Sequence, residues 1–208
     1  YVGGMIEEPG ELIVNTPEKY AALTGVTVLT GKEAIRLDAA SKSVAVKDVA
    51  TGEEEMLGYD KLVISVGASP SVPPVKGMGL SGVFTMRTPD DAIRVRDYVQ
   101  DNGVKKAVVV GAGFIGLEMA ENLQQQGLAV TVIDFASQIL PNILDEEMAV
   151  YGKKHLLKKG IRVITGTKAE EIVGEERVSA VKTSAGTLSC SLLIMAAGIR
   201  PNTAFLEG

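Results

Sequence analysis

The sequence predicts an α/β fold in which a parallel sheet carries an antiparallel β-meander, preceded by an incomplete second copy of the same fold. Three observations predict it. An aliphatic run leads into the glycine-rich segment Gly111–Gly116, and a second aliphatic run ends in the acid Asp134. Two glycine-bounded segments, 25–31 and 160–166, each open a similar series of short strand-like runs.

The glycine-rich segment lies between a predicted buried strand, Ala107–Val110, and a predicted helix, Ile115–Gln126. Its glycines follow the spacing G-x-G-x-x-G. In that pattern Gly111 permits a tight turn, Gly113 lets backbone approach a pyrophosphate, and Gly116 lets helix and strand pack closely. The pyrophosphate would lie at the helix N-terminus, where free N–H groups and the helix dipole favour an anion. The segment therefore predicts a Rossmann-like dinucleotide-binding domain.

The second aliphatic run indicates which dinucleotide is bound. Ala129–Ile133 is predicted to be a buried strand, and Asp134 follows it, 18 residues after Gly116. The fingerprint expects at this place a carboxylate that hydrogen-bonds the adenosine ribose. The next residues, Phe135–Ser137, supply no cation for a 2′-phosphate. We therefore predict NADH rather than NADPH.

The two glycine-bounded segments indicate an internal repeat. Each is followed by three β-like runs separated by turn residues, which is typical of a meander. Each series then closes with an aliphatic strand and a glycine, at 62–70 and 193–201. Repetition over a whole unit suggests a duplicated domain. The meander runs are 32–38, 43–48 and 53–58 in the first copy, and 168–173, 178–183 and 187–190 in the second.

The first copy is incomplete. In the second copy 49 residues separate Gly111 from Gly160, whereas only 24 residues precede Gly25, without a glycine-rich turn. The chain also begins at Tyr1 rather than at Met, so we expect it to be the middle portion of a longer protein. The prolines and glycine of 71–77 predict a linker. The expected domains are 1–76 and 77–208.

Composition limits the function classes. The apolar content of 46% is enough for a core, and the formal charge of −5 argues against nucleic acid as a partner. No apolar run reaches the roughly 18 to 20 residues of a membrane span, and no signal peptide is recognisable. We therefore expect a cytoplasmic protein. A single cysteine excludes an internal disulfide and a cysteine-rich metal site.

The remaining reactive side chains give no catalytic pattern. Cys190 enters a predicted buried strand without an adjacent cation to lower its pKa, so we interpret it as structural. His155, the one histidine, lies on a predicted surface helix, 145–159, whose acids come first and lysines last. A further helix is predicted at 88–102, starting with an N-cap threonine and a proline.

Taken together, these motifs resemble the FAD- and NAD-linked disulfide reductase family over essentially the whole chain. The residues that carry the resemblance are Gly111–Glu118 and the two closing segments, Ile64–Pro70 and Ala196–Asn202. Tyr1–Gly4 and Asn15–Glu18 are similar to the branch with coenzyme A disulfide reductase, NADH oxidase, NADH peroxidase and polysulfide reductase. That branch has one redox cysteine, which would fall just upstream of Tyr1, so we expect no catalytic residue within the chain.

The resemblance also implies roles for individual positions. Phe114 would be an aromatic gate over the flavin, and Glu118 would lie near nicotinamide and flavin. Ala197 and Gly198 would face the nicotinamide with their backbone, and Gly67 would pack against FAD. The expected NADH residues are therefore Gly111, Gly113, Phe114, Ile115, Gly116, Glu118, Asp134, Ala197 and Gly198, with Gly67 for FAD and none for a metal.

The implied parent protein passes hydride from NADH to FAD and on to a disulfide, a persulfide or polysulfide, or an oxygen species, as a homodimer acting on a small redox substrate. On this view 1–76 is a partial FAD-binding domain and 77–208 is the NADH-binding domain. Because the FAD turn and the redox cysteine are missing, we expect the chain alone to be inactive. Two alternatives stay open: a non-catalytic NADH-sensing module, and a ferredoxin- or quinone-linked NADH dehydrogenase.

Overall fold

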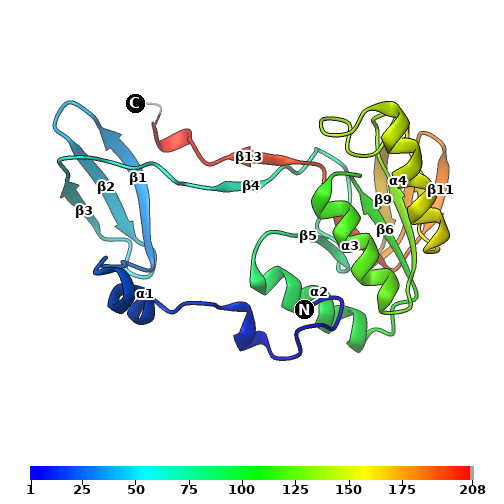
Figure 1. Cartoon of the computed structure of the whole chain (residues 1–208), viewed down its shortest axis with the longest axis horizontal. Coiled ribbons are helices and arrows are strands. Elements are labelled where there is room, and N and C mark those ends of the chain that lie inside the picture. The colour runs from blue at the N-terminus through cyan, green and yellow to red at the C-terminus, as the bar shows by residue number, and fades with distance from the viewer. Residues whose placement is uncertain (207–208) are drawn as a thin grey trace. The chain divides into compact units, whose positions relative to one another are not determined.

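The chain folds into two compact units (Figure 1), and this computed structural model describes residues 1–206. The larger unit comprises Tyr1–Leu12 and Pro70–Ile199, and the smaller unit comprises Ile13–Ser69 and the chain from Arg200. The division into domains at residues 76 and 77 stays a prediction. In the structure, residues 1–12 and 70–76, which the prediction places in the first domain, belong to the larger compact unit.

The larger unit is built on a five-stranded parallel sheet with the order β5-β12-β6-β7-β8. Each central strand sends alternate side chains to opposite faces, as strand geometry requires. Val109, Val132 and Ile194 belong to one buried cluster, and Val108, Ile133 belong to another. The strands are β5 (Val83–Thr85), β6 (Lys106–Val110), β7 (Ala129–Ile133), β8 (Arg162–Ile164) and β12 (Leu192–Met195).

Helices cover one face of this sheet and a meander covers the other. Val95 of α2, Leu123 of α3 and Leu156 of α4 share the cluster of Val109. The opposite cluster takes side chains such as Val181 from the antiparallel sheet β11-β10-β9. The predicted fold class is confirmed. These elements are α2 (Pro89–Asp101), α3 (Phe114–Gln125), α4 (Glu146–Lys158), β9 (Ala169–Gly174), β10 (Val178–Thr183) and β11 (Gly186–Ser189).

The starts of α2 and α4 follow from their sequences. Thr88 accepts a hydrogen bond from the Asp91 amide at 3.3 Å, and the Asp91 carboxylate accepts one from the Thr88 amide at 2.9 Å, which is a capping box. Burial alone would raise the pKa of Asp91. The backbone N–H groups of Thr88 and Arg87 and the Arg94 guanidinium together hold that pKa below its ordinary value. Asp145 caps α4 through the Met148 amide at 2.8 Å.

An N-terminal segment, which ends in the 3₁₀ turn η1 (Pro9–Leu12), packs on the larger unit. The Arg96 guanidinium of α2 lies 4.3 Å from the centre of the Tyr1 ring and donates to the Ile6 carbonyl at 3.1 Å. Val2 is buried, and a Cβ on Gly3 would meet Asn122 Oδ1 of α3 at 2.0 Å. The sequence motif Tyr1–Gly4 is therefore a packing segment on α2 and α3.

The smaller unit contains an antiparallel sheet in the order β1-β2-β3, which is the meander predicted for the first copy. It also contains a short helix. Its elements are α1 (Pro17–Thr24), β1 (Lys32–Asp38), β2 (Ser43–Asp48), β3 (Glu54–Gly58) and the 3₁₀ turn η2 (Ala204–Leu206). In addition, β4 (Ala68–Pro70) pairs with β13 (Ile199–Pro201) in a two-stranded sheet. Thr16 caps α1 through the Lys19 amide.

Two strands expected in the first copy are not formed, and these expectations were wrong. Residues 25–31 and 62–67 lie in no strand, and Leu29 and Val63 are 55% and 88% exposed. Their counterparts in the second copy, β8 and β12, are each paired with parallel neighbours. In the described part of the smaller unit no parallel neighbour offers such a ladder, so the aliphatic runs stay unpaired and largely exposed.

None of the helices in residues 1–206 combines the length and the apolar character needed to cross a membrane.

Candidate functional site

The glycine-rich turn joins β6 to α3, and two of its glycines are sterically required. A Cβ on Gly111 would lie 2.1 Å from the Ala196 carbonyl oxygen, and the φ of Gly111 is +112°. A Cβ on Gly116 would lie 1.9 Å from the Gly111 oxygen. These contacts are with backbone, which cannot move aside as a side chain can. The turn therefore depends on glycine at both positions.

Gly113 has a different environment. It is the N-cap of α3, no side chain caps the helix there, and no heavy atom lies within 4 Å of an added Cβ. Free N–H groups thus face open space at a helix start, which is the arrangement that binds phosphate. The positive φ of Gly111 and the crowding at Gly116 agree with a tight turn and with close packing of helix on strand, and the approach of pyrophosphate at Gly113 stays a prediction.

Ala112, inside the turn, is held from two sides. Its N–H donates to Asp134 Oδ2 at 2.5 Å, and its carbonyl accepts from the Leu140 N–H at 3.0 Å. Leu140 has a φ of +47°, in the left-handed region that is unfavourable for leucine. Sequence reasoning missed both contacts. Nothing in the sequence around Leu140 signals its conformation, because left-handed backbone is normally marked by glycine or asparagine.

Asp134 follows β7 and is only 8% exposed. Its second oxygen, Oδ1, accepts from the Ala136 N–H at 2.8 Å, a local turn that an aspartate two residues earlier could have signalled. Each carboxylate oxygen has a further lone pair, so both can still accept from a ribose. Asp134 thus fastens the glycine-rich turn to β7, and its role toward ribose stays a prediction.

The other expected nucleotide residues lie at the same edge of the sheet. Ala197 and Gly198 follow β12, which pairs with β6, and carboxyl ends of parallel neighbours meet at one edge. Both are exposed, and Gly198 has a φ of +108° with no heavy atom within 4 Å of an added Cβ. The contact between Gly111 and the Ala196 oxygen shows directly that the two loops touch.

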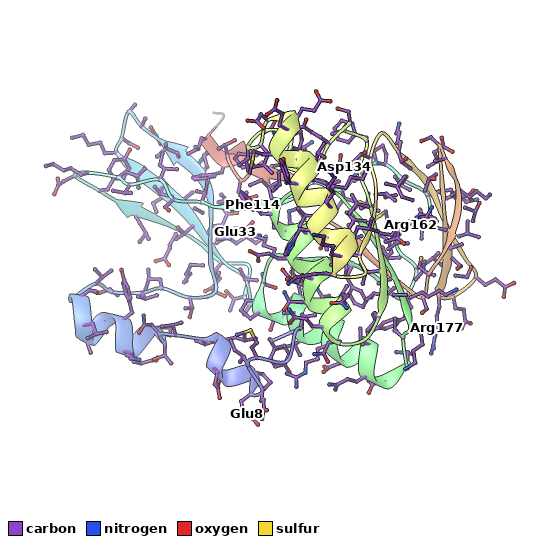
Figure 2. The ribbon with its side chains drawn as sticks, turned by 45° about the vertical axis from the view of Figure 1, so that its right-hand side comes forward. Glu8, Glu33, Phe114, Asp134, Arg162 and Arg177 are labelled. Atoms are coloured by element: carbon purple, nitrogen blue, oxygen red, sulfur yellow. The ribbon has the colours of Figure 1, made fainter. Side chains whose placement is uncertain are left out.

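On α3, three further expected residues are exposed. Phe114 is 59% exposed, Ile115 is 43% exposed and Glu118 lies on the surface. Phe114 and Glu118 are four positions apart, so they share one face of the helix. Figure 2 shows Phe114 at the start of α3 and Asp134 beyond the end of β7. The structure therefore brings the residues expected to bind NADH to one side of the larger unit.

Gly67, expected to pack against FAD, belongs to the smaller unit. It is exposed, has a φ of +63°, and its carbonyl accepts the Asn202 N–H at 3.1 Å. The Asn202 side chain also donates to the Val66 carbonyl at 3.0 Å and accepts from Ser69 Oγ at 2.8 Å. Asn202 thereby joins the ends of the two closing segments, a role that the sequence pattern did not indicate.

Neither reactive side chain singled out in the sequence lies in a catalytic cluster. Cys190 is 4% exposed, and burial raises the pKa of its thiol to about 11, so it stays protonated. His155 is on α4, outside the glycine-rich turn. Among residues 1–206, no group of three or more His, Cys, Asp or Glu side chains is placed to hold a metal ion.

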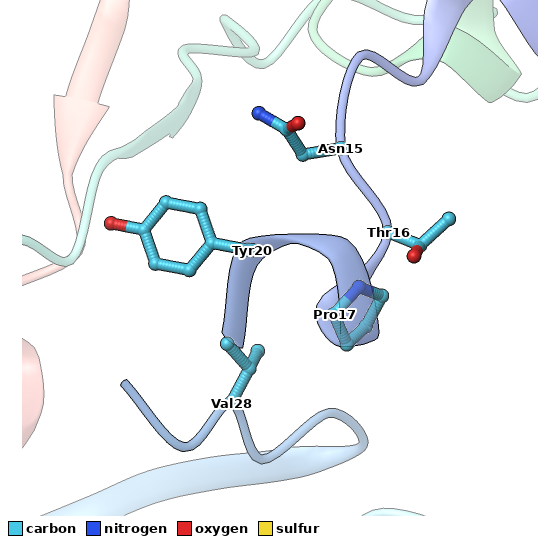
Figure 3. Close-up of a pocket in the computed structure, with 5 residues that line it drawn as sticks. All are labelled: Asn15, Thr16, Pro17, Tyr20 and Val28. Carbon is cyan, nitrogen blue, oxygen red and sulfur yellow. The ribbon is translucent and has the colours of Figure 1, made fainter. Parts of the chain in front are cut away.

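An open pocket of about 260 Å³ lies in the smaller unit. Its lining residues, shown in Figure 3, are Asn15, Thr16, Pro17, Tyr20 and Val28. They comprise the capped start of α1 and one side chain of the unpaired run 25–31, and none is charged. The pocket therefore offers only neutral side chains, among them the hydroxyl groups of Thr16 and Tyr20.

Comparisons with known proteins agree with this geometry. Residues 5–208 match the family model described as pyridine nucleotide-disulphide oxidoreductase. The chain is 41% identical to an NADH oxidase of Methanocaldococcus jannaschii, over 97% of this chain and 45% of that protein.

Two solved structures are also similar. An NAD-dependent persulfide reductase from A. fulgidus is 36% identical, with a TM-score of 0.92 over 100% of this chain and 39% of that one. An FAD-dependent pyridine nucleotide-disulphide oxidoreductase from Desulfovibrio vulgaris is 38% identical, with a TM-score of 0.74 over 88% of this chain and 47% of that one. The chain thus spans less than half the length of these relatives.

Proposed function

Because the chain belongs to the pyridine nucleotide-disulphide oxidoreductase family, we propose that it is the NADH-binding part of a flavoprotein that transfers hydride from NADH to FAD. From FAD the electrons pass to a disulfide, a persulfide or polysulfide, or an oxygen species. The observation that carries this proposal is the turn at the start of α3. There Gly113 leaves uncapped N–H groups open while Gly111 and Gly116 are packed against backbone.

The residues at this edge fit a bound dinucleotide. The free N–H groups at the start of α3 hold the pyrophosphate, and Asp134, fixed by the Ala112 and Ala136 amides, orients the adenosine ribose. Phe114 gates access to the site for the nicotinamide, while Glu118 and the open backbone at Gly198 position the ring. NADH itself supplies the hydride, and the protein contributes binding and alignment.

FAD fits this chain less well. Gly67 is the one FAD contact expected among the described residues, and the described part of the smaller unit forms no parallel sheet. The similarity to an FAD-dependent relative supports FAD as a cofactor of the whole protein.

The names of the relatives indicate which classes of molecule accept the electrons, since one relative is an NADH oxidase and another is a persulfide reductase. A small redox substrate, a homodimeric assembly and a cytoplasmic location belong to the same proposal, and so does the absence of nucleic acid as a partner, which the charge of −5 supports.

Anaerobic mixing of the whole flavoprotein with NADH tests the proposed transfer. We expect the visible flavin absorbance to be bleached within seconds, and a Phe114→Ala variant to change the rate of bleaching. NADH binding without bleaching would instead support the sensing module. Bleaching followed by electron delivery only to ferredoxin or quinone, in a protein without a redox cysteine, would support the dehydrogenase alternative.

A further inference from the structure

Phe135 is the most exposed aromatic side chain among residues 1–206, at 82%. It directly follows Asp134 and has no role in the packing of the larger unit. Phe84, by contrast, packs edge-on against Tyr98 with ring centres 5.4 Å apart. An aromatic ring contributes most to packing or binding energy when it is buried against another surface. The exposed ring of Phe135 is therefore a candidate contact for a ligand.

The backbone that carries Phe135 is fixed. The Asp134 N–H donates to the Ile164 carbonyl at 3.0 Å, and the Asp134 carbonyl accepts the Thr167 N–H at 2.7 Å. The Ala136 carbonyl accepts the Gly166 N–H, also at 2.7 Å. Residues on both sides of Phe135 are thus hydrogen-bonded to the segment after β8. The ring is held at a defined place at the edge of the sheet, and it is not part of a loose loop.

The order of the strands indicates which part of a dinucleotide lies at that place. The sheet runs β12-β6-β7, with Gly198 after β12, the phosphate-binding turn after β6 and Asp134 after β7. A dinucleotide laid across this edge has its nicotinamide toward Gly198 and its pyrophosphate at the turn. Its adenosine then lies beyond β7, where the ribose meets Asp134. The base adjoining that ribose reaches the side chain next to Asp134.

We infer that Phe135 is a stacking platform for the adenine ring, and hence a residue that determines the affinity for the adenosine half of the dinucleotide. The inference rests on the proposed function, because it takes the edge beyond β7 to be the adenosine site. An aromatic face attracts a purine through its π-face and the burial of apolar surface. Burying the ring under the base also removes the exposed apolar surface that the free chain carries at this position.

Titrations of the chain with NADH and with ADP-ribose, which keeps the adenosine, the pyrophosphate and the second ribose but lacks the nicotinamide ring, test the inference. Phe135→Ala should raise the Kd of both ligands about five- to tenfold, as expected for loss of one base stack. Phe135→Leu should weaken both ligands nearly as much, and Phe135→Tyr should restore the affinity. Melting temperatures should stay the same, because the ring is exposed. Tyr151→Ala is the matched control, since Tyr151 is an exposed aromatic residue on α4.

Equal Kd values for the unsubstituted chain and Phe135→Ala would overturn the inference while leaving the proposed function intact. Full affinity in Phe135→Leu would also overturn it, because a simple apolar cover would then suffice. If the unsubstituted, folded chain binds neither ligand, the inference and the proposed nucleotide site both fail.

Discussion

Among single residues, Asp134 has one task that we propose and a second that the structure shows. The sequence marked it as the acid that receives the ribose, and the structure adds that its carboxylate fastens the glycine-rich turn through Ala112. Spacing from Gly116 predicts the first task. The second depends on how close β6 and β7 lie in the folded sheet, which no local pattern contains.

Replacing Asp134 should therefore affect both stability and binding. Asp134→Ala leaves the buried Ala112 N–H without its acceptor, so we expect the free energy of unfolding to fall by about 1–3 kcal/mol. Asp134→Asn keeps an acceptor oxygen and should lose less stability, yet it removes the charge that favours NADH over NADPH. Urea unfolding together with NADH and NADPH titrations measures both effects. Unchanged affinities for both nucleotides in the Asn variant would remove Asp134 from the ribose site.

Cys190 should be unreactive in the folded chain. Its pKa is raised to about 11 by burial, whereas an unfolded thiol ionises near pH 8.5. In the folded state the Cys190 thiol therefore keeps its proton to a higher pH than in the unfolded state. Its contribution to the free energy of unfolding is complete below about pH 8.5 and is lost as the pH rises toward 11. We expect a thiol reagent to modify Cys190 slowly until urea unfolds the chain. A fast reaction at neutral pH without unfolding would contradict this assignment.

At the scale of elements, the turn between β6 and α3 contains two glycines packed against backbone, Gly111 and Gly116, and one glycine in open space, Gly113. Gly111→Ala places a Cβ 2.1 Å from the Ala196 oxygen at a φ of +112°. We expect it to lower the free energy of unfolding by about 2–4 kcal/mol, from backbone strain and overlap.

Gly113→Ala is the matched variant, because its Cβ meets no heavy atom within 4 Å and its φ of −80° suits any residue. The free energy of unfolding of this variant should lie within about 1 kcal/mol of that of the unsubstituted chain, as expected for a change at a glycine N-cap. The variant should nevertheless bind NADH much more weakly, because the added methyl group blocks the phosphate. Thermal unfolding and NADH titration of both variants separate the two effects. Full NADH affinity in a folded Gly113→Ala variant would show that phosphate does not approach there.

Elements with strong local signals were predictable from the sequence. Helix α2 begins where Thr88 and a following proline predict it, and β6 and β7 coincide with their aliphatic runs. Leu140 shows the limit, because its left-handed backbone goes with a hydrogen bond to the distant Ala112 and runs against the preference of leucine itself. The packing of Tyr1–Gly4 on α2 and α3 was equally invisible, since it joins residues far apart in the chain.

At the scale of the whole molecule, the two copies differ in what their aliphatic runs can pair with. The meander β1-β2-β3 forms from consecutive hairpins, so local sequence suffices to predict it. The runs 25–31 and 62–67 are aliphatic like their counterparts, yet they form no strand. A parallel strand requires neighbours supplied from elsewhere in the chain, and this requirement cannot be read from the run itself.

Amide hydrogen exchange should reveal this difference. We expect the amides of 62–66 to exchange at rates near those of an unstructured peptide, because they lie in no strand. The corresponding strand β12, hydrogen-bonded to β5 on one side and β6 on the other, should be among the slowest to exchange. Comparable protection of the two segments would mean that 62–66 is paired in solution, against the structure.

The central claim, that the edge beyond β6 and β7 binds NADH, is tested most directly by calorimetric titration of the chain with NADH, NADPH and FAD. We expect NADH to bind more tightly than NADPH, because the Asp134 carboxylate would repel a 2′-phosphate, and FAD to bind weakly or not at all. Circular dichroism on the same sample establishes that the chain is folded. A folded chain that ignores NADH, or that prefers NADPH, would contradict the account.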